Sequence, residues 1–272
     1  MDVSLTFVQS YQFERGRELA QPSHNHCVPE GPSILILKEK IKSFENKKVV
    51  EASGTAKIDM KRISGKKITS IESWGKHTLI CFKGFFIRIH LLMFGTYRIN
   101  ERRDSKPRLC LSFSKGEINF YTCNVILLEG SPEDVYDMKA DVMSDKWDAK
   151  AAEKKLKELT KSKDLNVCDA LLDQQTFSGV GNIIKNESLF LARIHPDSLV
   201  NDLPLKKLRE LIKKTETYTW NFFNWKKEGT LSKNFKVYEK KVCPRCNIPV
   251  VKKNVGKGKR LTVYCANCQL LY

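Results

Sequence analysis

The hydrophobic pattern along the chain changes its period near residue 130. Before this point, apolar and β-branched residues alternate with polar ones in short segments that are separated by glycine-containing turns, as is typical of β-strands. Eight such segments lie at 48–52, 67–73, 77–82, 85–91, 97–100, 108–113, 118–121 and 125–128. They predict an antiparallel β-sandwich or barrel.

Helical spacing dominates the rest of the chain. A first amphipathic helix is expected over 34–44, directly after the rigid sequence Pro29-Glu-Gly-Pro32. Beyond the strands, 149–159 and 205–223 repeat their apolar residues every three to four positions, and shorter helices are expected over 168–175 and 183–191. The sequence therefore predicts an α+β multidomain protein, with an N-terminal antiparallel β-sandwich flanked by helices and a helical C-terminal domain.

Two C-x2-C pairs near the C-terminus change this picture. Their four thiols, spaced as two knuckles, are typical of a tetrahedral zinc site. The ligands are Cys243, Cys246, Cys265 and Cys268. Residues 247–264 between the pairs predict a β-hairpin with a glycine-rich, basic tip. Four protein ligands leave no open position for water, so we expect one structural Zn²⁺ in a zinc β-hairpin finger; disulfides are the alternative.

The charge of the chain favours a polyanionic partner. Among 272 residues, 48 Lys and Arg outnumber 31 Asp and Glu, which gives a formal net charge of +17. Nucleic acid is the commonest partner of such a protein, although a solvated basic surface gives the same composition. The other five cysteines lie mostly among apolar residues and suggest free thiols in the cytoplasm. We expect no membrane segment, and the absence of a coiled-coil pattern suggests a monomer.

A glycine turn between the two short helices carries the most specific signal. Gly179-Val-Gly-Asn182 opens a helix and can present backbone N–H groups to a phosphate, although a plain helical turn is an equal alternative. Together, Leu171-Leu-Asp-Gln174, Gly179-Val-Gly-Asn182, Glu187-Ser-Leu-Phe190 and His195-Pro196 resemble the helix-two-turn-helix of the formamidopyrimidine-DNA glycosylase and endonuclease VIII family.

Three further motifs support the resemblance in chain order. Pro29-Glu-Gly-Pro32 is similar to the family's N-terminal signature, Gly75-Lys76 is similar to its hairpin lysine, and the segment from Arg260 to Gln269 resembles its zinc hairpin. The chain looks most like an endonuclease VIII-like member of bacterial type. The resemblance implies a helix-two-turn-helix domain, damaged double-stranded DNA as partner and a nucleoid-associated enzyme.

The resemblance also implies a mechanism. Pro29 would be the amine nucleophile that forms a Schiff base at C1′, and Glu30 would be the general acid and base. The expected activity is that of a bifunctional DNA glycosylase and abasic-site lyase of base excision repair, which removes oxidised bases and cleaves the strand by β/δ-elimination. A short loop over 226–236 slightly favours oxidised pyrimidines.

Other residues are expected to contact DNA. By resemblance, Lys76, Asn182 and Arg260 bind phosphates near the extruded nucleotide. Alternatively, the two cations are ordinary solvated charges and Asn182 caps a helix. The apolar residues Leu92, Met93 and Phe94 are expected to fill the gap that this nucleotide leaves, although a core position is the commoner role of such a methionine.

One feature contradicts this mechanism. The nitrogen of an internal proline is a tertiary amide and cannot form a Schiff base. We therefore expect translation to begin at Val28 and the enzyme to begin at Pro29; the alternative is a real extension that is either cleaved or leaves the protein inactive. The expected division is an extension over 1–28 that is absent from the mature protein, a catalytic sandwich over 29–145, a helix-two-turn-helix domain over 146–238 and a finger over 239–272. The alternatives are a catalytically silent DNA-binding relative and a zinc-ribbon RNA-binding factor.

Overall fold

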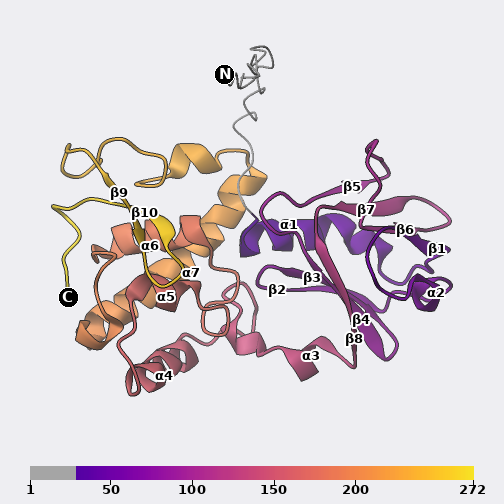
Figure 1. The fold of residues 1–272 in the computed structure, drawn as a ribbon, viewed down its shortest axis with the longest axis horizontal. Coiled ribbons are helices and arrows are strands. Elements are labelled where there is room, and N and C mark those ends of the chain that lie inside the picture. The colour runs from indigo at the N-terminus through magenta and orange to yellow at the C-terminus, as the bar shows by residue number, and fades with distance from the viewer. Residues whose placement is uncertain (1–28) are drawn as a thin grey trace, which may run out of the picture.

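The N-terminal lobe is a sandwich of two four-stranded antiparallel sheets, seen in a computed structural model that describes residues 29–272 (Figure 1). One sheet has the order β1-β6-β7-β5 and the other has the order β2-β3-β4-β8. The strands are β1 (Glu51–Ser53), β2 (Ser70–Trp74), β3 (His77–Phe82), β4 (Phe85–His90), β5 (Thr96–Ile99), β6 (Leu109–Ser112), β7 (Glu117–Tyr121) and β8 (Asn124–Glu129). The predicted sandwich is confirmed.

The first two strands begin about three residues later than the sequence predicts. Lys48 and Lys67 pair with each other in an isolated bridge, so regular sheet pairing begins only at Glu51 and Ser70. Between these strands lies the short helix α2 (Met60–Ile63). The core between the sheets is aliphatic and aromatic, with Leu109, Ile118 and other side chains fully buried.

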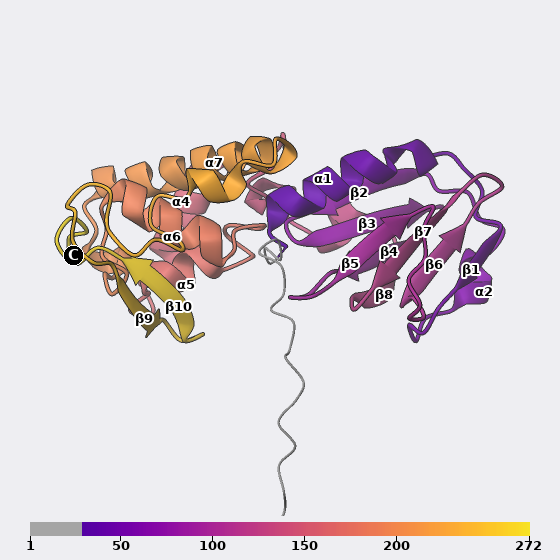
Figure 2. The same cartoon turned by 90° about the horizontal axis from the view of Figure 1, so that it is seen from above.

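Helix α1 (Gly31–Ile41) connects the two lobes. It begins at the proline-containing segment that the sequence marks, and it continues in a 3-10 turn over Lys42–Phe44. Its buried face packs against β2 and β3, and also against the long helix α7 (Leu205–Lys227) of the other lobe. Figure 2 shows α1 and α7 along one side of the molecule, with the finger strands on the opposite side.

The C-terminal lobe is helical. After α3 (Pro132–Val135) and a 3-10 turn at Met138–Ala140, the chain forms α4 (Ala149–Thr160), α5 (Val167–Leu172) and α6 (Asn182–Ala192). Two 3-10 turns, Val200–Asp202 and Leu231–Asn234, flank α7. Helix α5 ends three residues before its predicted end, because the carboxylate of Asp173 accepts hydrogen bonds from the Gln175 amide and the Thr176 hydroxyl and closes a turn.

The finger follows as the predicted hairpin. Strand β9 (Val251–Val255) pairs with β10 (Arg260–Tyr264), and the pair packs on α6. Cys81, Cys110, Cys123 and Cys168 are buried free thiols as expected, whereas Cys27 and the predicted extension over 1–28 lie outside the described residues. Within residues 29–272, no helix has both the length and the apolar character that a membrane span requires.

Candidate active site

Glu30 lies at the N-terminus of α6, where the two lobes meet. Its side chain is 1% exposed. One carboxylate oxygen accepts a hydrogen bond from the Ile183 amide at 2.8 Å, and the other accepts from the Gly181 and Ile184 amides at 3.1 and 3.3 Å. These amides are the free donors of a helix N-terminus, and the helix dipole favours a negative charge there. The glycine turn of the sequence thus binds a carboxylate from the other lobe.

Opposing effects act on the pKa of Glu30. Burial raises the pKa above its usual value and is the largest effect, while the charge of Lys76 and the three amides lower it. The net direction is upward. A buried carboxyl with a raised pKa and a cation nearby is suited to transferring protons.

Close backbone packing fixes this junction. The Gly31 amide donates a hydrogen bond to the Gly179 carbonyl at 2.8 Å, and a Cβ on Gly31 would lie 2.9 Å from the Gly179 Cα. A Cβ on Gly181 would collide with the carboxyl group of Glu30. Glycine is therefore required where the lobes meet, which explains the glycine-rich turn in the sequence.

A cavity of about 360 Å³ opens above Glu30. The structure brings most of the predicted site residues to it. Its lining consists of Pro29, Glu30, Trp74, Lys76, His77, His90, Leu92, Met93, Gln174, Gly181, Asn182 and Arg260. One cavity therefore joins a candidate nucleophile, a buried carboxyl, two cations and two apolar side chains, and these groups come from four separate parts of the chain.

The apolar residues stand out from the surface. Leu92, Met93 and Phe94 lie in the turn after β4 and are 46%, 52% and 67% exposed. The core alternative for Met93 is therefore wrong. Leu92 has a positive φ of 55°, which an L-residue rarely adopts. The loop then turns tightly at Gly95, where a Cβ would collide with the Leu91 carbonyl. We call residues 91–95 the wedge loop.

Asn182 has a contact that the sequence did not predict. Its side-chain Nδ2 donates a hydrogen bond to the Leu261 carbonyl of β10 at 2.9 Å. The helix-capping alternative is wrong, because the N-cap of α6 is Gly181. One turn further, Asn186 accepts a hydrogen bond from the Val263 amide at 2.7 Å. Helix α6 thus fixes the position of β10, whose first residue is Arg260.

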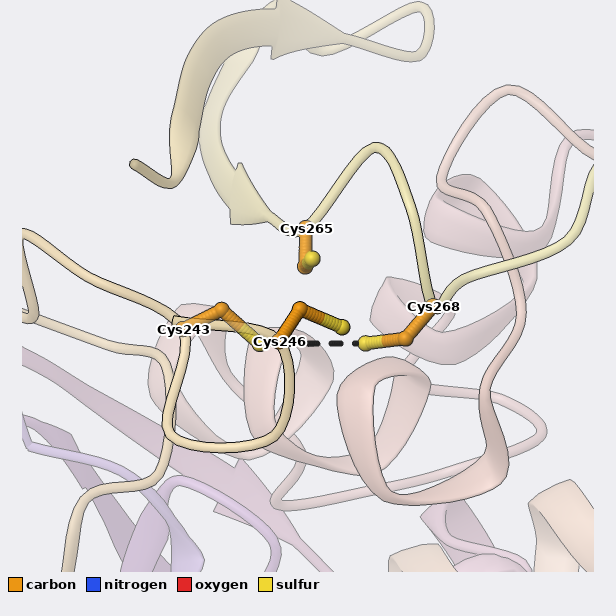
Figure 3. Close-up of side chains that lie close together, drawn as sticks. All are labelled: Cys243, Cys246, Cys265 and Cys268. Carbon is orange, nitrogen blue, oxygen red and sulfur yellow. Dashed lines mark hydrogen bonds between the residues drawn. The ribbon is translucent and has the colours of Figure 1, made fainter. Parts of the chain in front are cut away.

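The four predicted metal ligands converge beside these strands (Figure 3). Their sulfur atoms all lie within 4.8 Å of one another, and Cys243 Sγ lies 3.8 Å from Cys268 Sγ. A tetrahedral site with Zn–S bonds of about 2.3 Å has sulfur–sulfur edges of about 3.8 Å. The arrangement fits a four-thiolate metal site, and these cysteines are free thiols rather than the disulfides of the alternative hypothesis.

Similarity to known proteins covers both lobes. Residues 28–123 match the formamidopyrimidine-DNA glycosylase N-terminal domain, and residues 140–220 match the formamidopyrimidine-DNA glycosylase H2TH domain. Endonuclease 8-like 2 of Homo sapiens is 30% identical over 278 residues, which span 95% of this chain and 80% of that protein. The chain belongs to the formamidopyrimidine-DNA glycosylase and endonuclease VIII family.

Further relatives of this glycosylase family member are longer or more distant. Endonuclease 8-like 3 of Mus musculus is 33% identical over 219 residues, which cover 77% of this chain but only 36% of that protein. The chain thus spans about a third of the length of such relatives. A viral DNA glycosylase and the Lactococcus lactis formamidopyrimidine-DNA glycosylase bound to abasic-site DNA share the fold. Each is 22% identical, with TM-scores of 0.75 and 0.76; the alignments cover 89% and 88% of this chain and 100% and 99% of those chains.

Membership in the glycosylase family removes support for the RNA-binding hypothesis, which required the order of the motifs to be a coincidence.

The structure also adds buried polar residues that the sequence did not reveal. Lys185 of α6 is fully buried, and its Nζ donates a hydrogen bond to Thr262 Oγ1 of β10 at 2.7 Å. Burial lowers its pKa. Asn186, Glu187 and Ser188, which follow it, are polar, so no local signal in the sequence indicates the burial of this lysine.

His77 is a further case, whereas Glu187 belongs to a motif that the sequence already indicates. His77 lines the cavity beside His90, at 5.2 Å between ring centroids, and its pKa is lowered to about 3, chiefly by burial. Glu187 is fully buried and accepts hydrogen bonds from the amides of Lys236, Val237 and Tyr238. Its role is to fix the segment that leads into the finger.

Proposed function

We propose that this chain is a bifunctional DNA glycosylase and abasic-site lyase that removes oxidised bases from double-stranded DNA. The observation that carries the proposal is the buried Glu30 carboxyl at the floor of a cavity that Pro29 lines, with Lys76 and Arg260 in the same wall. A carboxyl that can transfer protons, an adjacent amine and flanking cations are the groups that base excision and strand cleavage require.

The chemistry begins with the amine of Pro29. An extruded nucleotide presents C1′ to this nitrogen, which displaces the base and forms an iminium ion as the sugar ring opens. The departing base takes up the proton that the Pro29 nitrogen loses, and Glu30 supplies a proton to the ring oxygen. Glu30 afterwards accepts the C2′ proton while the 3′ phosphate leaves in β-elimination. Loss of the 5′ phosphate completes δ-elimination, and water hydrolyses the iminium to free the Pro29 amine. These reaction steps require a chain that begins at Pro29, because the nitrogen of Pro29 must be a free secondary amine.

Phosphate contacts and the wedge position the DNA. Lys76 and Arg260 bind the phosphates beside the extruded nucleotide. The side chain of Asn182 also binds phosphate, and its hydrogen bond to the Leu261 carbonyl sets the position of β10. Leu92, Met93 and Phe94 enter the base stack from the wedge loop. This role agrees with their exposure, since large apolar side chains in soluble proteins seldom cluster on the surface without a partner.

A second cavity on the other side of Pro29 has room for the extruded base. It has a volume of about 750 Å³ and lies between α1, β5 and the end of α7. Ser33 and Thr96 line it, and their buried hydroxyl oxygens have no hydrogen-bond partner within residues 29–272. These hydroxyls suit the carbonyl and N–H groups of a base. Between α7 and the finger strands, the described chain forms only the short 3-10 turn Leu231–Asn234, and this short connection supports a preference for oxidised pyrimidines over purines.

One Zn²⁺ bound by the four finger cysteines stabilises the hairpin and takes no part in bond breaking. The active form is a monomer divided into a catalytic sandwich over 29–145, a helix-two-turn-helix domain over 146–238 and a finger over 239–272.

Borohydride trapping on abasic-site DNA tests the proposed chemistry. A chain that begins at Pro29 is expected to give a covalent adduct through its N-terminal amine. A catalytically silent DNA-binding relative is the second candidate, because residues 1–28 precede Pro29 in the sequence. Tight DNA binding by the Pro29-initiated chain without any adduct would favour this candidate.

Three lesion duplexes test the substrate preference. The Pro29-initiated chain should cleave duplexes with thymine glycol or dihydrouracil faster than a duplex with 8-oxoguanine opposite cytosine. Faster cleavage at 8-oxoguanine would refute the pyrimidine preference and leave the glycosylase activity intact.

A further inference from the structure

A groove between α4 and α7 lies apart from the cavity above Glu30. It has a volume of about 650 Å³, and residues 149–157 of α4 and 209–216 of α7 line it. None of these described residues lines the cavity above Glu30. Helix α4 packs against α7, and Figure 2 shows α7 on the side of the molecule opposite the finger strands. DNA bound between Glu30 and Arg260 therefore leaves this groove, which we call the basic groove, accessible.

The walls of the basic groove concentrate positive charge. Helix α4 contains four lysines and two glutamates, and α7 contains seven basic residues and two glutamates. These two helices thus contribute +7 to the formal net charge of +17. The basic residues that face the groove are Lys150, Lys154, Lys157, Arg209 and Lys213. Phosphate binding on the opposite side of the molecule does not use this charge, which attracts an anionic partner of its own.

An ion pair between the helices fixes the shape of the groove. The carboxylate of Glu153 on α4 accepts hydrogen bonds from Arg209 of α7 at 2.8 Å and from Lys157 at 2.6 Å. Arg209 and Lys157 lower the pKa of Glu153 to about 2, so the carboxylate stays ionised and its charge is compensated. On the rim, Lys150 forms no ion pair within residues 29–272, and Lys154 only approaches Glu158 at 3.9 Å. These rim lysines can bind a further carboxylate.

The spacing of the cations matches a helical ligand. Lys150, Lys154 and Lys157 lie at positions i, i+4 and i+7 of α4, and Arg209 and Lys213 lie at positions i and i+4 of α7. Residues at this spacing share one face of a helix, and four residues advance along its axis by about 6 Å. An approaching helix with carboxylates at the same spacing can therefore pair with both rows.

The floor of the groove suits the apolar face of such a helix. Ala149 and Ile212 line it together with the methylene groups of the lysine side chains. An amphipathic helix that lays its apolar face into a groove between two helices is a common mode of peptide recognition. Charge and shape thus favour the same kind of ligand.

Nucleic acid fits the groove less well than a peptide. The axes of packed helices lie about 8–10 Å apart, so a DNA duplex is too wide to enter between them. Sites for single-stranded nucleic acid combine cations with aromatic rings on which the bases stack. Among the described residues that line the basic groove, none is aromatic.

We propose that the basic groove binds an acidic amphipathic helix of a partner protein. The carboxylates of this helix pair with the lysines of the rim, and its apolar face covers Ala149 and Ile212. Because the groove and the finger strands lie on opposite sides, the partner and DNA bind at the same time. The inference goes beyond the proposed function and does not depend on whether the chain cleaves DNA.

A synthetic helical peptide tests this inference with the complete 272-residue chain. The fluorescent peptide carries Glu at positions i, i+4 and i+7 of one face and Leu on the adjacent face, and binding is measured by fluorescence anisotropy. The triple variant Lys150→Glu, Lys154→Glu, Lys213→Glu reverses the charge of the rim. We expect it to bind the peptide at least tenfold more weakly than wild type. A scrambled peptide of the same composition should bind wild type at least fivefold more weakly.

A matched variant controls for the change in net charge. Lys57, Lys66 and Lys83 are exposed lysines of the sandwich lobe, remote from α4 and α7 in the sequence. Their replacement by Glu changes the net charge by the same amount and should reduce peptide binding less than threefold. Circular dichroism checks the fold of both triple variants, in which every replaced side chain is exposed.

Two further measurements locate the bound peptide. Carbodiimide joins carboxylates directly to amines, and mass mapping should place the cross-links on Lys150, Lys154 or Lys213. A duplex with an abasic-site analogue should leave the peptide bound, because it occupies the opposite side of the molecule.

Several outcomes would overturn the inference. These are the absence of peptide binding up to 200 µM, an equal loss of affinity in both triple variants, equal binding of the scrambled peptide, displacement of the peptide by the duplex, and cross-links that map to the finger. A single-stranded oligothymidine that loses at least tenfold in affinity with the groove variant, while the peptide does not, would assign the groove to nucleic acid instead.

Discussion

Glu30→Gln separates the catalytic role of the carboxyl from its structural role. The substitution preserves the shape of the side chain but removes its ability to transfer a proton. Proton transfer by a positioned side chain commonly contributes about 10²–10⁴-fold to a rate. Base excision by a Pro29-initiated chain should therefore fall by at least 100-fold, while binding to a duplex with a stable abasic-site analogue should change less than threefold.

The structural cost follows from the three amides that surround the carboxyl. A glutamine carbonyl oxygen can accept from Gly181 and Ile184 together, but its NH₂ group then faces the Ile183 amide. One unpartnered buried donor costs about 1–3 kcal/mol, and the removal of a buried charge offsets part of this cost. We expect a net loss of about 1–2 kcal/mol at neutral pH.

The pH dependence of stability adds a second readout. Because the folded-state pKa of Glu30 is raised above the usual value of 4.5, its contribution to stability is complete below pH 4.5 and is lost as the pH rises through the folded pKa. Glutamine does not titrate. The difference in unfolding free energy between wild type and Glu30→Gln should therefore decrease from pH 4 to pH 8 in denaturant titrations.

Single-turnover excision is the decisive assay, with circular dichroism and metal content as controls for the fold. Retention of full excision by a folded Glu30→Gln variant would refute the role of the carboxyl. A stability difference that grows with pH would contradict the raised pKa.

Four further substitutions test other parts of the site. Arg260→Gln should weaken binding to all duplex sequences and reduce the slope of log K against log salt by about one, as expected for one lost phosphate contact. Gly181→Ala should destabilise the fold and lower excision, because the added Cβ overlaps the carboxyl of Glu30. Lys185→Met should leave thermal stability unchanged or raise it, since an apolar side chain avoids the desolvation cost of a buried ammonium. Cys265→Ser should lower the zinc content from one ion per chain and weaken DNA binding, because β10 ends beside this ligand.

Specific results would contradict these expectations. An unchanged salt slope after Arg260→Gln, measured by fluorescence anisotropy, would exclude a phosphate contact. Normal excision by Gly181→Ala would show that the backbone at this turn can move. A large fall in the melting temperature of Lys185→Met would mean that its bond to Thr262 stabilises the fold more than its burial costs. Full DNA binding by zinc-free Cys265→Ser would separate the finger from recognition.

The sequence predicted the architecture because the responsible patterns are local. The short apolar run along 77–82 and the alternation toward the end of 85–91 are sufficient to predict β3 and β4. Two C-x2-C pairs likewise predict a four-sulfur site without knowledge of the fold. The errors lie at the ends of elements. An isolated bridge at Lys48 delays the start of β1, and hydrogen bonds to the side chain of Asp173 end α5 early.

Long-range contacts within the site could not be predicted in the same way. Nothing local to Glu30 indicates that the amides of α6, about 150 residues later, bind its carboxylate. The burial of Lys185 and the bond from Asn182 to Leu261 likewise depend on how the finger packs on α6. The resemblance to a family supplied the site residues, and the structure supplied the physical reason for their arrangement.

The release of a damaged base from DNA tests the central claim most directly. A chain that begins at Pro29 is mixed in excess with a duplex that contains one dihydrouracil, and the free base is quantified by mass spectrometry before any strand-cleavage step is scored. The account predicts release of about one base per duplex, with little release by Glu30→Gln. Tight binding of the duplex without release of the base would contradict it.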